Sequence, residues 1–527
     1  MSSNTSASAP APDISTEKLG PLMRALVVIE KVGNKLPHPF WLFIGLAVFV
    51  MVLSSVLSKA GLNAVNPATE ETVTAVDLLS AENLRAIVSG VVTNYTEFPA
   101  LGLVLVVMFG VAVAERSGLI PVLMRGALVK TNPRYITVVV ALVGAAASMA
   151  SDASYMIVIP LGGLAFRAVG RNPVIGCAVA YAATSGGYSA APFVNSLDAI
   201  LGGISTSAAH IVDETYTVTP VANLFFNFVS MFAVAAAVTL VTELLLNKRG
   251  EQMTLDADVV ESEDDHRLTA ITAEEKRGMV VAGIGLVLSI VLVVVLAWPS
   301  GSFLRDAEGG FGPESGLMAG IAAIIGFGFW ILGIMYGVAT KSIRTWSDIP
   351  DMMVKGLAPF IQVLVLFFAA SQFLALFKMS GLGEIFAIKG AEFFQSIGAN
   401  SFVILLGTYL LVALAALFIT SGSGLWTLLA PVLVPMLMFL GIAPETTQAV
   451  YRIGDSTTNI ISPMSPYFIM ILGFIQRYKK DAGIGTLLSL TIPLSIGMFL
   501  VWGLLFFVWW ALGIPMGPGA PSTYPAG

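Results

Sequence analysis

The sequence predicts an all-α polytopic membrane protein with nine transmembrane helices and two opposed re-entrant hairpins, arranged as inverted-topology repeats. Composition is the first reason: 56% of the 527 residues are hydrophobic and only 11% are charged, whereas soluble domains carry about 25% charged residues. The second reason is the recurrence of apolar segments near the roughly 20 residues that a transmembrane helix needs. The third reason is a long apolar stretch that occurs twice.

The repeated stretch lies at 150–195 and again at 421–466, a shift of 271 positions (421 − 150 = 271). In that ungapped register three pairs of prolines coincide: Pro160 with Pro431, Pro173 with Pro444, and Pro192 with Pro463. Hydrophobic segments that Pro and Gly interrupt, one in each half of the chain, indicate the binding site of a secondary transporter. We therefore predict a transporter built from two copies of one unit, with these prolines as helix punctuation.

Apolar runs between charged loops define the predicted spans. Nine full spans are expected at 39–58, 101–114, 173–204, 220–246, 279–298, 317–340, 357–376, 444–476 and 484–510, with hairpins at about 135–170 and 401–441. Shorter amphipathic helices are expected near 78–92 and 346–354. The predicted segments are a cytoplasmic tail with an amphipathic N-terminal piece (1–36), a first transmembrane half (37–246), an acidic cytoplasmic loop (247–277), a second transmembrane half (278–513) and a C-terminal tail (514–527).

The distribution of Lys and Arg predicts the orientation, because cytoplasmic loops are enriched in both. Basic residues before the first span place the N-terminus in the cytoplasm, and alternation of the spans places the C-terminus outside. Basic residues flank both ends of the first hairpin, so it is expected to enter from the cytoplasm. Neither end of the second hairpin is basic, so it is expected to enter from outside. The two copies therefore have opposite orientation.

Each copy has a hairpin with a polar tip and a helix with a polar interruption. The interruptions are expected to be unwound at 184–187 and 455–459, and the tips to lie at 151–154 and 421–424. Unwound carbonyls and helix C-termini suit a small hard cation such as Na+. The residues expected to bind or couple the cation are Ser151, Asp152, Ser154, Thr184, Ser185 and Gly186 in the first copy, and Ser421, Ser423, Ser456, Thr457 and Asn459 in the second. Close helix packing is the alternative reason for small residues at these tips.

The substrate prediction depends on two charged residues at membrane depth. Placing a charge there costs free energy, so such residues are usually functional. Arg452 precedes Asp455 by three residues, so both face one side of a helix, and a guanidinium binds a carboxylate bidentately. A structural Arg–Asp pair is the alternative. Asp198 is predicted to couple protons or a cation, or else to be a helix-end residue. Trp426 is predicted to stack on an aromatic substrate, or else to pack the hairpin tip.

The sequence argues against several other classes of protein. The single Cys177 excludes an internal disulfide and a cysteine metal cluster, and three histidines without ligand spacing argue against a transition-metal site. No basic patch for nucleic acid, no phosphate-binding P-loop and no HExxH motif is present. Neither an enzyme nor a cofactor is therefore expected. An anion channel is an alternative of a different class, which the paired blocked hairpins argue against.

Three motifs are similar to those of a known family. The first tip reads SDASY from Ser151, the second reads SGSGLW from Ser421, and the interrupted helix reads YRIGDSTTNIISPMSPY from Tyr451. Together they resemble the AbgT family of p-aminobenzoyl-glutamate transporters, and the resemblance covers 18–513. It implies a homodimer in the bacterial inner membrane, with nine helices and two opposed hairpins per protomer, an architecture shared with the divalent-anion/sodium symporters of the ion transporter superfamily.

The resemblance also implies functional residues and a substrate. Carried over by motif, the family's functional positions are Asp198, Ser423, Trp426, Pro444, Arg452, Asp455 and Pro463. The implied activities are transport of p-aminobenzoyl-glutamate and export of sulfonamide antimetabolites, coupled to Na+, H+ or both. A dicarboxylate with an aromatic ring suits Arg452 and Trp426, with Asn459 as a further contact. A sodium-coupled dicarboxylate symporter of the same superfamily is the alternative, which Trp426 and the SGSG tip argue against. The direction of transport stays open.

Overall fold

The computed structural model describes residues 37–525, apart from 68, 129–130, 151–152, 257–270 and 313. The N-terminal tail and most of the acidic loop therefore lie outside the described residues. The described chain is mostly helical, and its one sheet pairs β1 (Asn63–Val65) with β2 (Thr72–Thr74) in antiparallel fashion. Seven of the described helical segments are long and apolar enough to cross a membrane. The helical membrane class is confirmed, while nine spans and re-entrant hairpins stay predictions.

The first half of the chain contains the helices up to the acidic loop. They are α2 (Pro39–Lys59), α3 (Ala81–Thr96), α4 (Pro99–Arg116), α5 (Leu119–Leu128), α6 (Ile136–Ala146), α7 (Ala153–Ala168), α8 (Pro173–Gly186), α9 (Ser196–Ala209), α10 (Leu224–Val241) and α11 (Asn247–Glu251). A π-helical turn, Thr242–Leu246, joins α10 to α11. Three-residue and four-residue 3₁₀ segments, Pro133–Tyr135 and Ala147–Ala150, flank α6.

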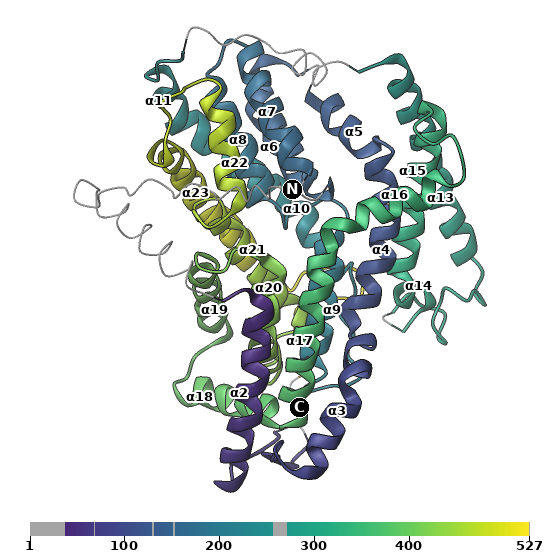
Figure 1. Ribbon diagram of the computed structural model, residues 1–527, viewed down its shortest axis with the longest axis vertical. Coiled ribbons are helices and arrows are strands. Elements are labelled where there is room, and N and C mark those ends of the chain that lie inside the picture. Colours follow the sequence, from purple (N-terminus) through teal and green to yellow (C-terminus); the bar gives the residue numbers. More distant parts are fainter. Residues whose placement is uncertain are drawn as a thin grey trace, which may run out of the picture.

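The second half continues from the acidic loop to the C-terminus. Its helices are α13 (Ala273–Ala297), α14 (Gly316–Ala319), α15 (Ile321–Thr340), α16 (Asp348–Leu357), α17 (Ile361–Met379), α18 (Leu382–Ser396), α19 (Ser401–Ala416), α20 (Gly422–Met438), α21 (Pro444–Asn459), α22 (Pro466–Gln476) and α23 (Ile484–Ala511). In Figure 1, α6, α7 and α8 lie towards the top of the view and α2, α3 and α18 towards the bottom, with α9, α20 and α21 between them.

The internal repeat is visible in the element boundaries. Subtracting 271 from the first residues of α20, α21 and α22 gives 151, 173 and 195, and α7, α8 and α9 begin at 153, 173 and 196. Both second helices begin with a proline, whose missing N–H and fixed φ suit the first helical position. The loops before them also match: Gly170 and Gly441 have φ of +76° and +77°, a left-handed conformation that Gly adopts at helix C-termini without steric cost.

The polar interruptions lie later in the chain than the sequence predicts. In the first copy α8 stays helical through Gly186, and the non-helical stretch is 187–195. In the second copy α21 stays helical through Asn459, and the non-helical stretch is 460–465. The hydroxyls of Thr457 and Thr458 donate to the carbonyls of Ile453 and Gly454, at 2.7 and 2.9 Å, so these polar residues are accommodated inside a helix. The helix ends at Asn459 because a proline four residues later clashes with the carbonyl at that position.

The second hairpin tip also differs from its prediction. Helix α19 ends at Ala416, and Ser421 is the N-cap of α20, where its hydroxyl accepts a hydrogen bond from the amide of Gly424 at 3.2 Å. Residues 417–421 therefore form the tip, and 422–424 form the first turn of α20. In the first hairpin, α6 and α7 flank Ser151 and Asp152, which lie outside the described residues.

The C-terminal segment is packed, whereas the sequence predicts a tail. We call residues 513–525 the C-terminal strap. Met516 and Ala520 are buried in it. The amide of Tyr524 donates to the carbonyl of Gly441 at 2.9 Å, and the hydroxyl of Thr446 donates to the carbonyl of Ser522 at 2.9 Å. The strap therefore covers the loop between α20 and α21 and the start of α21. Helices α5 and α18 and the small sheet are further elements that the sequence does not predict.

Candidate functional site

Among the described residues, four charged side chains are buried, and all four lie on α9 or α21. They are Asp198, Glu445, Arg452 and Asp455, with exposed fractions of 3, 2, 1 and 4%. On α21 the polar positions are spaced by three and four residues, which places them on one face of the helix. We call this set the polar stripe of α21; it consists of Glu445, Gln448, Arg452, Asp455 and Asn459. Charges buried at this depth need partners or ligands.

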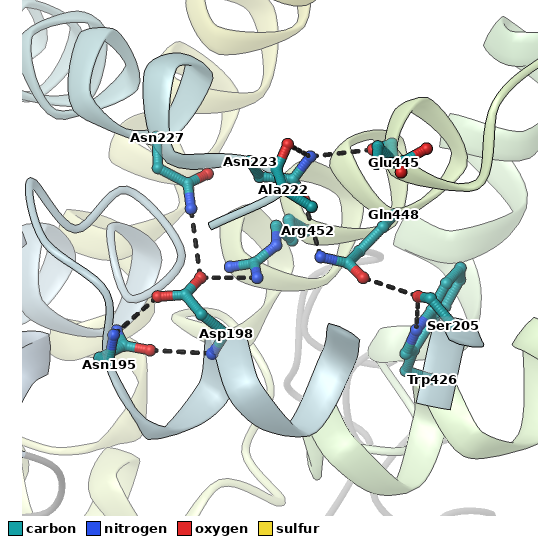
Figure 2. A network of polar contacts seen from close by, with 10 residues as sticks. All are labelled: Asn195, Asp198, Ser205, Ala222, Asn223, Asn227, Trp426, Glu445, Gln448 and Arg452. Carbon is teal, nitrogen blue, oxygen red and sulfur yellow. Dashed lines mark hydrogen bonds and ion pairs between the residues drawn. The ribbon is translucent and has the colours of Figure 1, made fainter. Parts of the chain in front are cut away.

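Arg452 pairs with an acid of the other copy. Its Nη2 lies 2.7 Å from Oδ1 of Asp198, and Figure 2 shows the two side chains pointing toward each other between α9 and α21. Asp198 is fixed at the start of α9 by a capping box, in which it accepts from the Asn195 amide at 2.8 Å and Asn195 Oδ1 accepts from the Asp198 amide at 3.1 Å. Asn227 donates to the same carboxylate at 3.3 Å. Among the described residues no ion pair joins Arg452 to Asp455, so the expected structural Arg–Asp pair involves Asp198 instead.

Trp426 is held in a hydrogen-bonded network rather than facing an open site. Its side chain is 0% exposed, its Nε1 donates to the hydroxyl of Ser205 at 3.0 Å, and its ring lies 4.5 Å from the ring of Tyr451. Ser205 donates to Gln448 at 2.6 Å, and Gln448 donates to Asn223 at 2.8 Å (Figure 2). In this arrangement Trp426 packs the hairpin, which is the alternative that the sequence left open.

Gln448 connects that network to the charged pair. A half-turn of its amide places the oxygen 3.3 Å from Arg452 Nη2 and the nitrogen 3.1 Å from the carbonyl of Leu201. Asn and Gln amides are oriented by their hydrogen-bonding surroundings, and the two orientations fill the same space. In either orientation Gln448 stands between Ser205 and Asn223, so α9, the start of α10 and α21 meet at this side chain.

Several buried polar atoms of the site have no hydrogen-bond partner in the described structure. More than 90% of buried polar groups in proteins are satisfied, so each exception points to a ligand, ion or water. Two belong to the guanidinium, and the others lie on α21, at the start of α9 and on α10: Arg452 Nε and Nη1, Asp455 Oδ1, Ser456 Oγ, Asn459 Oδ1, Asn195 Nδ2 and Asn227 Oδ1. The stripe is therefore built to receive polar groups that the protein itself does not supply.

The start of α20, directly after the tip of the second hairpin, lies against the polar stripe of α21. Tyr451 donates its hydroxyl hydrogen to the carbonyl of Gly422, and a Cβ on Gly422 would lie only 3.0 Å from Oδ2 of Asp455. Ser462, in the non-helical stretch after α21, donates to the carbonyl of Leu417 at 3.1 Å. The start of α20 therefore contacts α21, and the tip contacts the interruption that follows α21.

A cavity of about 210 Å³ opens beside this tip. Its wall consists of tip residues, the first residues of α2 and one residue of the interruption: Pro37, His38, Pro39, Leu42, Phe43, Phe418, Ile419, Thr420, Ser421, Gly424, Leu428 and Met464. Pro463, next to Met464, is half-buried. Ser423 is half-buried as well, and its carbonyl accepts from the hydroxyl of Thr427 at 2.7 Å.

The first predicted cation site is described only in part, because Ser151 and Asp152 lie outside the described residues. Ser154 and Ser185 are buried, and the hydroxyl of Thr184 is buried without a partner. Gly186 packs against Met498 and Ile460. In the second site, Ser456 and Asn459 offer unpartnered oxygens, whereas Thr457 bonds within its own helix and its carbonyl accepts from Ser495 at 2.7 Å.

The sequence and the fold both match known proteins. A model of the family described as "AbgT putative transporter family" matches residues 24–524. The chain belongs to the AbgT family. It is 34% identical over 491 residues to the p-aminobenzoyl-glutamate transport protein of Escherichia coli K12, covering 93% of this chain and 95% of that protein.

Two solved structures of transporters share the fold. The YdaH transporter of Alcanivorax borkumensis, whose topology is described as unusual, is 39% identical with a TM-score of 0.85, covering 92% of this chain and all of that one. MtrF of Neisseria gonorrhoeae, described as illuminating a class of antimetabolite efflux pumps, is 38% identical with a TM-score of 0.89, covering 94% of this chain and all of that one. The resemblance to the AbgT family is confirmed: the chain is a multi-pass membrane transporter and not an enzyme.

Sequence reasoning missed part of this AbgT-family site. It predicted Asp198, Trp426, Arg452 and Asp455, which the structure gathers at one place. It did not single out the uncharged and acidic residues that join them: Asn195, Ser205, Asn223, Asn227, Glu445 and Gln448. The spacing of three and four residues along α21 was the available signal for Glu445 and Gln448, because a polar stripe in an otherwise buried helix marks one functional face.

Proposed function

We propose that this AbgT-family transporter moves p-aminobenzoyl-glutamate and related aromatic carboxylates across the bacterial inner membrane. The observation that carries the proposal is the guanidinium of Arg452. One of its terminal nitrogens holds Asp198, while Nε and Nη1 are buried and have no partner. A carboxylate of the substrate accepts charge-assisted hydrogen bonds from such free N–H groups. The likeness to the Escherichia coli protein supports the choice of substrate.

The aromatic end of the substrate is assigned to the cavity beside the second tip. The cavity has apolar walls from Leu42, Phe43, Phe418 and Leu428 and a polar edge at Ser421. An apolar cavity of about 150 Å³ is large enough for a benzene ring, so about 210 Å³ accommodates the p-aminobenzoyl group. Trp426 does not line the cavity; it holds α20 in place through Ser205 and Tyr451. Ser423 and Pro463 are each next to a residue of the cavity wall, Gly424 and Met464, and Asn459 is assigned to the polar end of the substrate.

Transport is coupled to Na+, H+ or both. Asp455 Oδ1, Ser456 Oγ and Asn459 Oδ1 are buried oxygens without partners, and several oxygens from one element suit a hard cation. The first copy contributes a second cation site around its own tip, with Ser154, Thr184 and Ser185.

A homodimer is the proposed assembly. Export of sulfonamide antimetabolites is a second activity, which the likeness to the Neisseria efflux pump favours.

Flux measurements in proteoliposomes test this proposal. Labelled p-aminobenzoyl-glutamate should enter vesicles faster with a Na+ gradient, a proton gradient or both than with neither. Unlabelled competitors separate the two ends of the substrate: p-aminobenzoyl-glutamate should compete far better than glutamate, which lacks the ring, or p-aminobenzoate, which lacks the dicarboxylate. Vesicles that accumulate succinate and ignore p-aminobenzoyl-glutamate would support a dicarboxylate symporter instead. A labelled sulfonamide in the same vesicles tests the second activity.

A further inference from the structure

Glu445 is a buried carboxylic acid that the proposed substrate site does not use. It lies in the first turn of α21, and its carboxylate accepts a hydrogen bond from the hydroxyl of Tyr216 at 2.9 Å. No salt bridge pairs it with a cation among the described residues. A carboxylate taken out of water without a cation is so costly that it binds a proton or a cation instead. A buried acid at membrane depth is therefore a functional candidate.

The buried charges of the described residues are unbalanced. The four charged side chains that are buried there comprise three acids, Asp198, Glu445 and Asp455, and one base, Arg452. With every group ionised the net charge is three minus one, or two negative charges, and an anionic substrate adds to the imbalance. Asp198 is neutralised directly by Arg452, at 2.7 Å. Two acids remain, so the site calls for two further positive charges, of which Asp455 with its unpartnered neighbours receives one.

The surroundings of Glu445 single it out as a proton acceptor rather than a metal ligand. Tyr216 faces it from the loop before α10, the uncharged Asn223 faces it from the start of α10, and the next charge along α21 is Arg452. Behind Tyr216 lie His210, whose ring contacts the Tyr216 carbonyl at 3.1 Å, and Asp213, which accepts from Tyr524 of the strap at 3.3 Å. Farther out, Lys378 pairs with the exposed Glu214 at 2.6 Å.

The other acid near this end is held ionised. The hydroxyl of Thr215 holds the pKa of Asp213 below its usual value, and the hydroxyl of Tyr524 acts in the same direction. Asp213 therefore carries its charge at neutral pH and does not serve as the proton site. Thr215 and Glu214 are exposed and Tyr216 is half-buried, so Glu445 lies one hydrogen bond behind a residue that water partly reaches.

Glu445 is also joined mechanically to the substrate site. Arg452 lies seven positions after Glu445 on the same helical face, about 10 Å further along the helix. Its backbone carbonyl accepts from Asn223 at 2.9 Å, and Asn223 accepts in turn from Gln448 (Figure 2). A change of charge at Glu445 thus acts on the same part of α21 as Gln448. Gln448 is hydrogen-bonded to Ser205, and Ser205 is hydrogen-bonded to Trp426.

We infer that Glu445 is a second coupling site of this transporter, where a proton binds during each cycle. The inference rests on the proposed transport of an anionic substrate. The proton passes from water to a carboxylate oxygen of Glu445, which makes that end of α21 neutral when the site closes. The proton leaves when α21 is again exposed to water, and the carboxylate is restored. No bond other than the O–H bond forms or breaks.

Proton movement with each substrate tests the inference. Vesicles loaded with a pH-sensitive dye and supplied with labelled p-aminobenzoyl-glutamate report both fluxes together. Glu445→Gln removes the titrating group while keeping its size, so the number of protons moved per substrate should fall by about one and the pH dependence of flux should flatten. Glu392→Gln is the matched control, because Glu392 is exposed and pairs with Lys389 at 3.1 Å; it should behave as the unmodified protein does.

Tyr216→Phe gives a second, milder test that keeps the acid. The Tyr216 hydroxyl stabilises the ionised carboxylate, so its loss lets the proton stay bound to higher pH. The midpoint of the flux profile should move upward by about half a pH unit to one unit, the shift expected for one hydrogen bond. An infrared carboxylic-acid band that titrates in the unmodified protein should be absent in Glu445→Gln, which tests the group without transport.

The outcomes separate this inference from the proposed function. Substrate flux without any proton movement in the unmodified protein overturns the inference and leaves the transport proposal standing. Unchanged proton stoichiometry and an unchanged infrared spectrum in Glu445→Gln also overturn it. Absence of p-aminobenzoyl-glutamate flux in every condition removes the proposed function instead, and the infrared titration still decides whether Glu445 binds a proton.

Discussion

The two copies of the repeat share a frame and differ in chemistry. After helices α7 and α20 the same turn is made twice: the amide of Arg171 donates to the carbonyl of Phe166 at 2.8 Å, and the amide of Ile442 donates to the carbonyl of Leu437 at 2.9 Å. Each pair of positions differs by 271. The next helices, α8 and α21, are buried along almost their whole length. The duplication therefore fixed the backbone geometry of both halves.

The side chains of those two helices differ at the decisive positions. Where α21 carries Arg452 and Asp455, the 271-residue shift places Tyr181 and Thr184 on α8. Among the described residues, three of the four buried charges lie on α21 and the fourth is Asp198, at the start of α9. In the described part of the chain the two copies therefore share a backbone frame, while the buried charges are concentrated in the second copy. Variants at matched positions test this division.

The largest effect is expected for Arg452→Gln. It leaves Asp198 as a buried carboxylate without its cation, and breaking a buried ion pair in this way costs about 3–5 kcal/mol of stability. Substrate flux should become undetectable, and the melting temperature in detergent should fall. The matched change in the first copy, Tyr181→Phe, should retain most of the flux.

A double variant separates binding from folding at this pair. Arg452→Gln with Asp198→Asn removes both charges, so stability should recover relative to Arg452→Gln alone, as a double-mutant cycle requires for coupled groups. Flux should stay absent because the substrate carboxylate has no guanidinium to bind. Recovery of flux together with stability would show that the pair is only structural.

The second effect concerns Asp455, whose Oδ1 is buried without a partner. Asp455→Asn keeps the shape of the side chain and removes its charge, so flux should fall at least about tenfold and lose its dependence on the coupling cation. Thr184→Val is the matched change in the first copy and removes another unpartnered buried oxygen. Because Thr184 belongs to the proposed first cation site, Thr184→Val should also lower flux, but less than Asp455→Asn, which removes a charge. Equal losses in both variants would contradict the proposed asymmetry.

The third effect tests the contact between the start of α20 and the polar stripe of α21. A methyl group on Gly422 would lie 3.0 Å from Oδ2 of Asp455, so Gly422→Ala pushes that carboxylate from its place. Crowding of this kind in a packed region costs about 1–3 kcal/mol, and flux should fall by about threefold to tenfold. Gly407→Ala, on the other arm of the hairpin, is the control because nothing lies within 4 Å of its Cβ position. A normal flux for Gly422→Ala would show that the tip does not need its present distance from Asp455.

The frame could be predicted from sequence because its signals are local. Pro173 and Pro444 start helices, and Gly170 and Gly441 allow the left-handed turns before them, without help from distant residues. The interruptions were harder to place because Thr457 and Thr458, in the polar run at 455–459, bond their hydroxyls to carbonyls of α21, and the helix continues through the run. Helix α18 and the C-terminal strap escaped prediction because each is stabilised by packing against remote parts of the chain, which no local pattern reveals.

The candidate site, like the fold, could be predicted from the sequence only in part. The cost of burying charge was enough to select Arg452 and Asp455, but it did not identify their partners. Arg452 meets Asp198 from the opposite half of the chain, and Trp426 meets Ser205, also from the opposite half. Such contacts depend on how the two copies cross, which the 271-residue shift alone does not specify. Glu445 and Gln448 escaped prediction for a different reason: they lie at the start of α21, far from the interruption, and only the spacing of three and four residues connects them to it.

The smallest effect is expected at the contacts that hold the loop between α7 and α8 in the first copy and the loop between α20 and α21 in the second, because these contacts differ between the copies. In the first copy the loop between α7 and α8 is clamped by Arg171, which bonds Glu243 at 2.9 Å and Thr137 at 2.8 Å. In the second copy the strap covers the equivalent loop, and the hydroxyl of Tyr524 reaches Asp213 at 3.3 Å. Tyr524→Phe removes that one bond, keeps the ring, and should lower stability by about 0.5–1.5 kcal/mol with near-normal flux.

Truncating a buried residue of the strap provides the reference for that small effect. Met516→Ala removes a fully buried side chain and should cost about 2–5 kcal/mol, measured by the same melting experiment. If Tyr524→Phe instead abolishes flux while stability is kept, the strap takes part in the transport cycle and is not only a restraint. The second copy would then differ from the first in how it moves as well as in the charges that it carries, because the Arg171 clamp joins neighbouring helices, whereas the strap joins the second copy to the loop that follows α9.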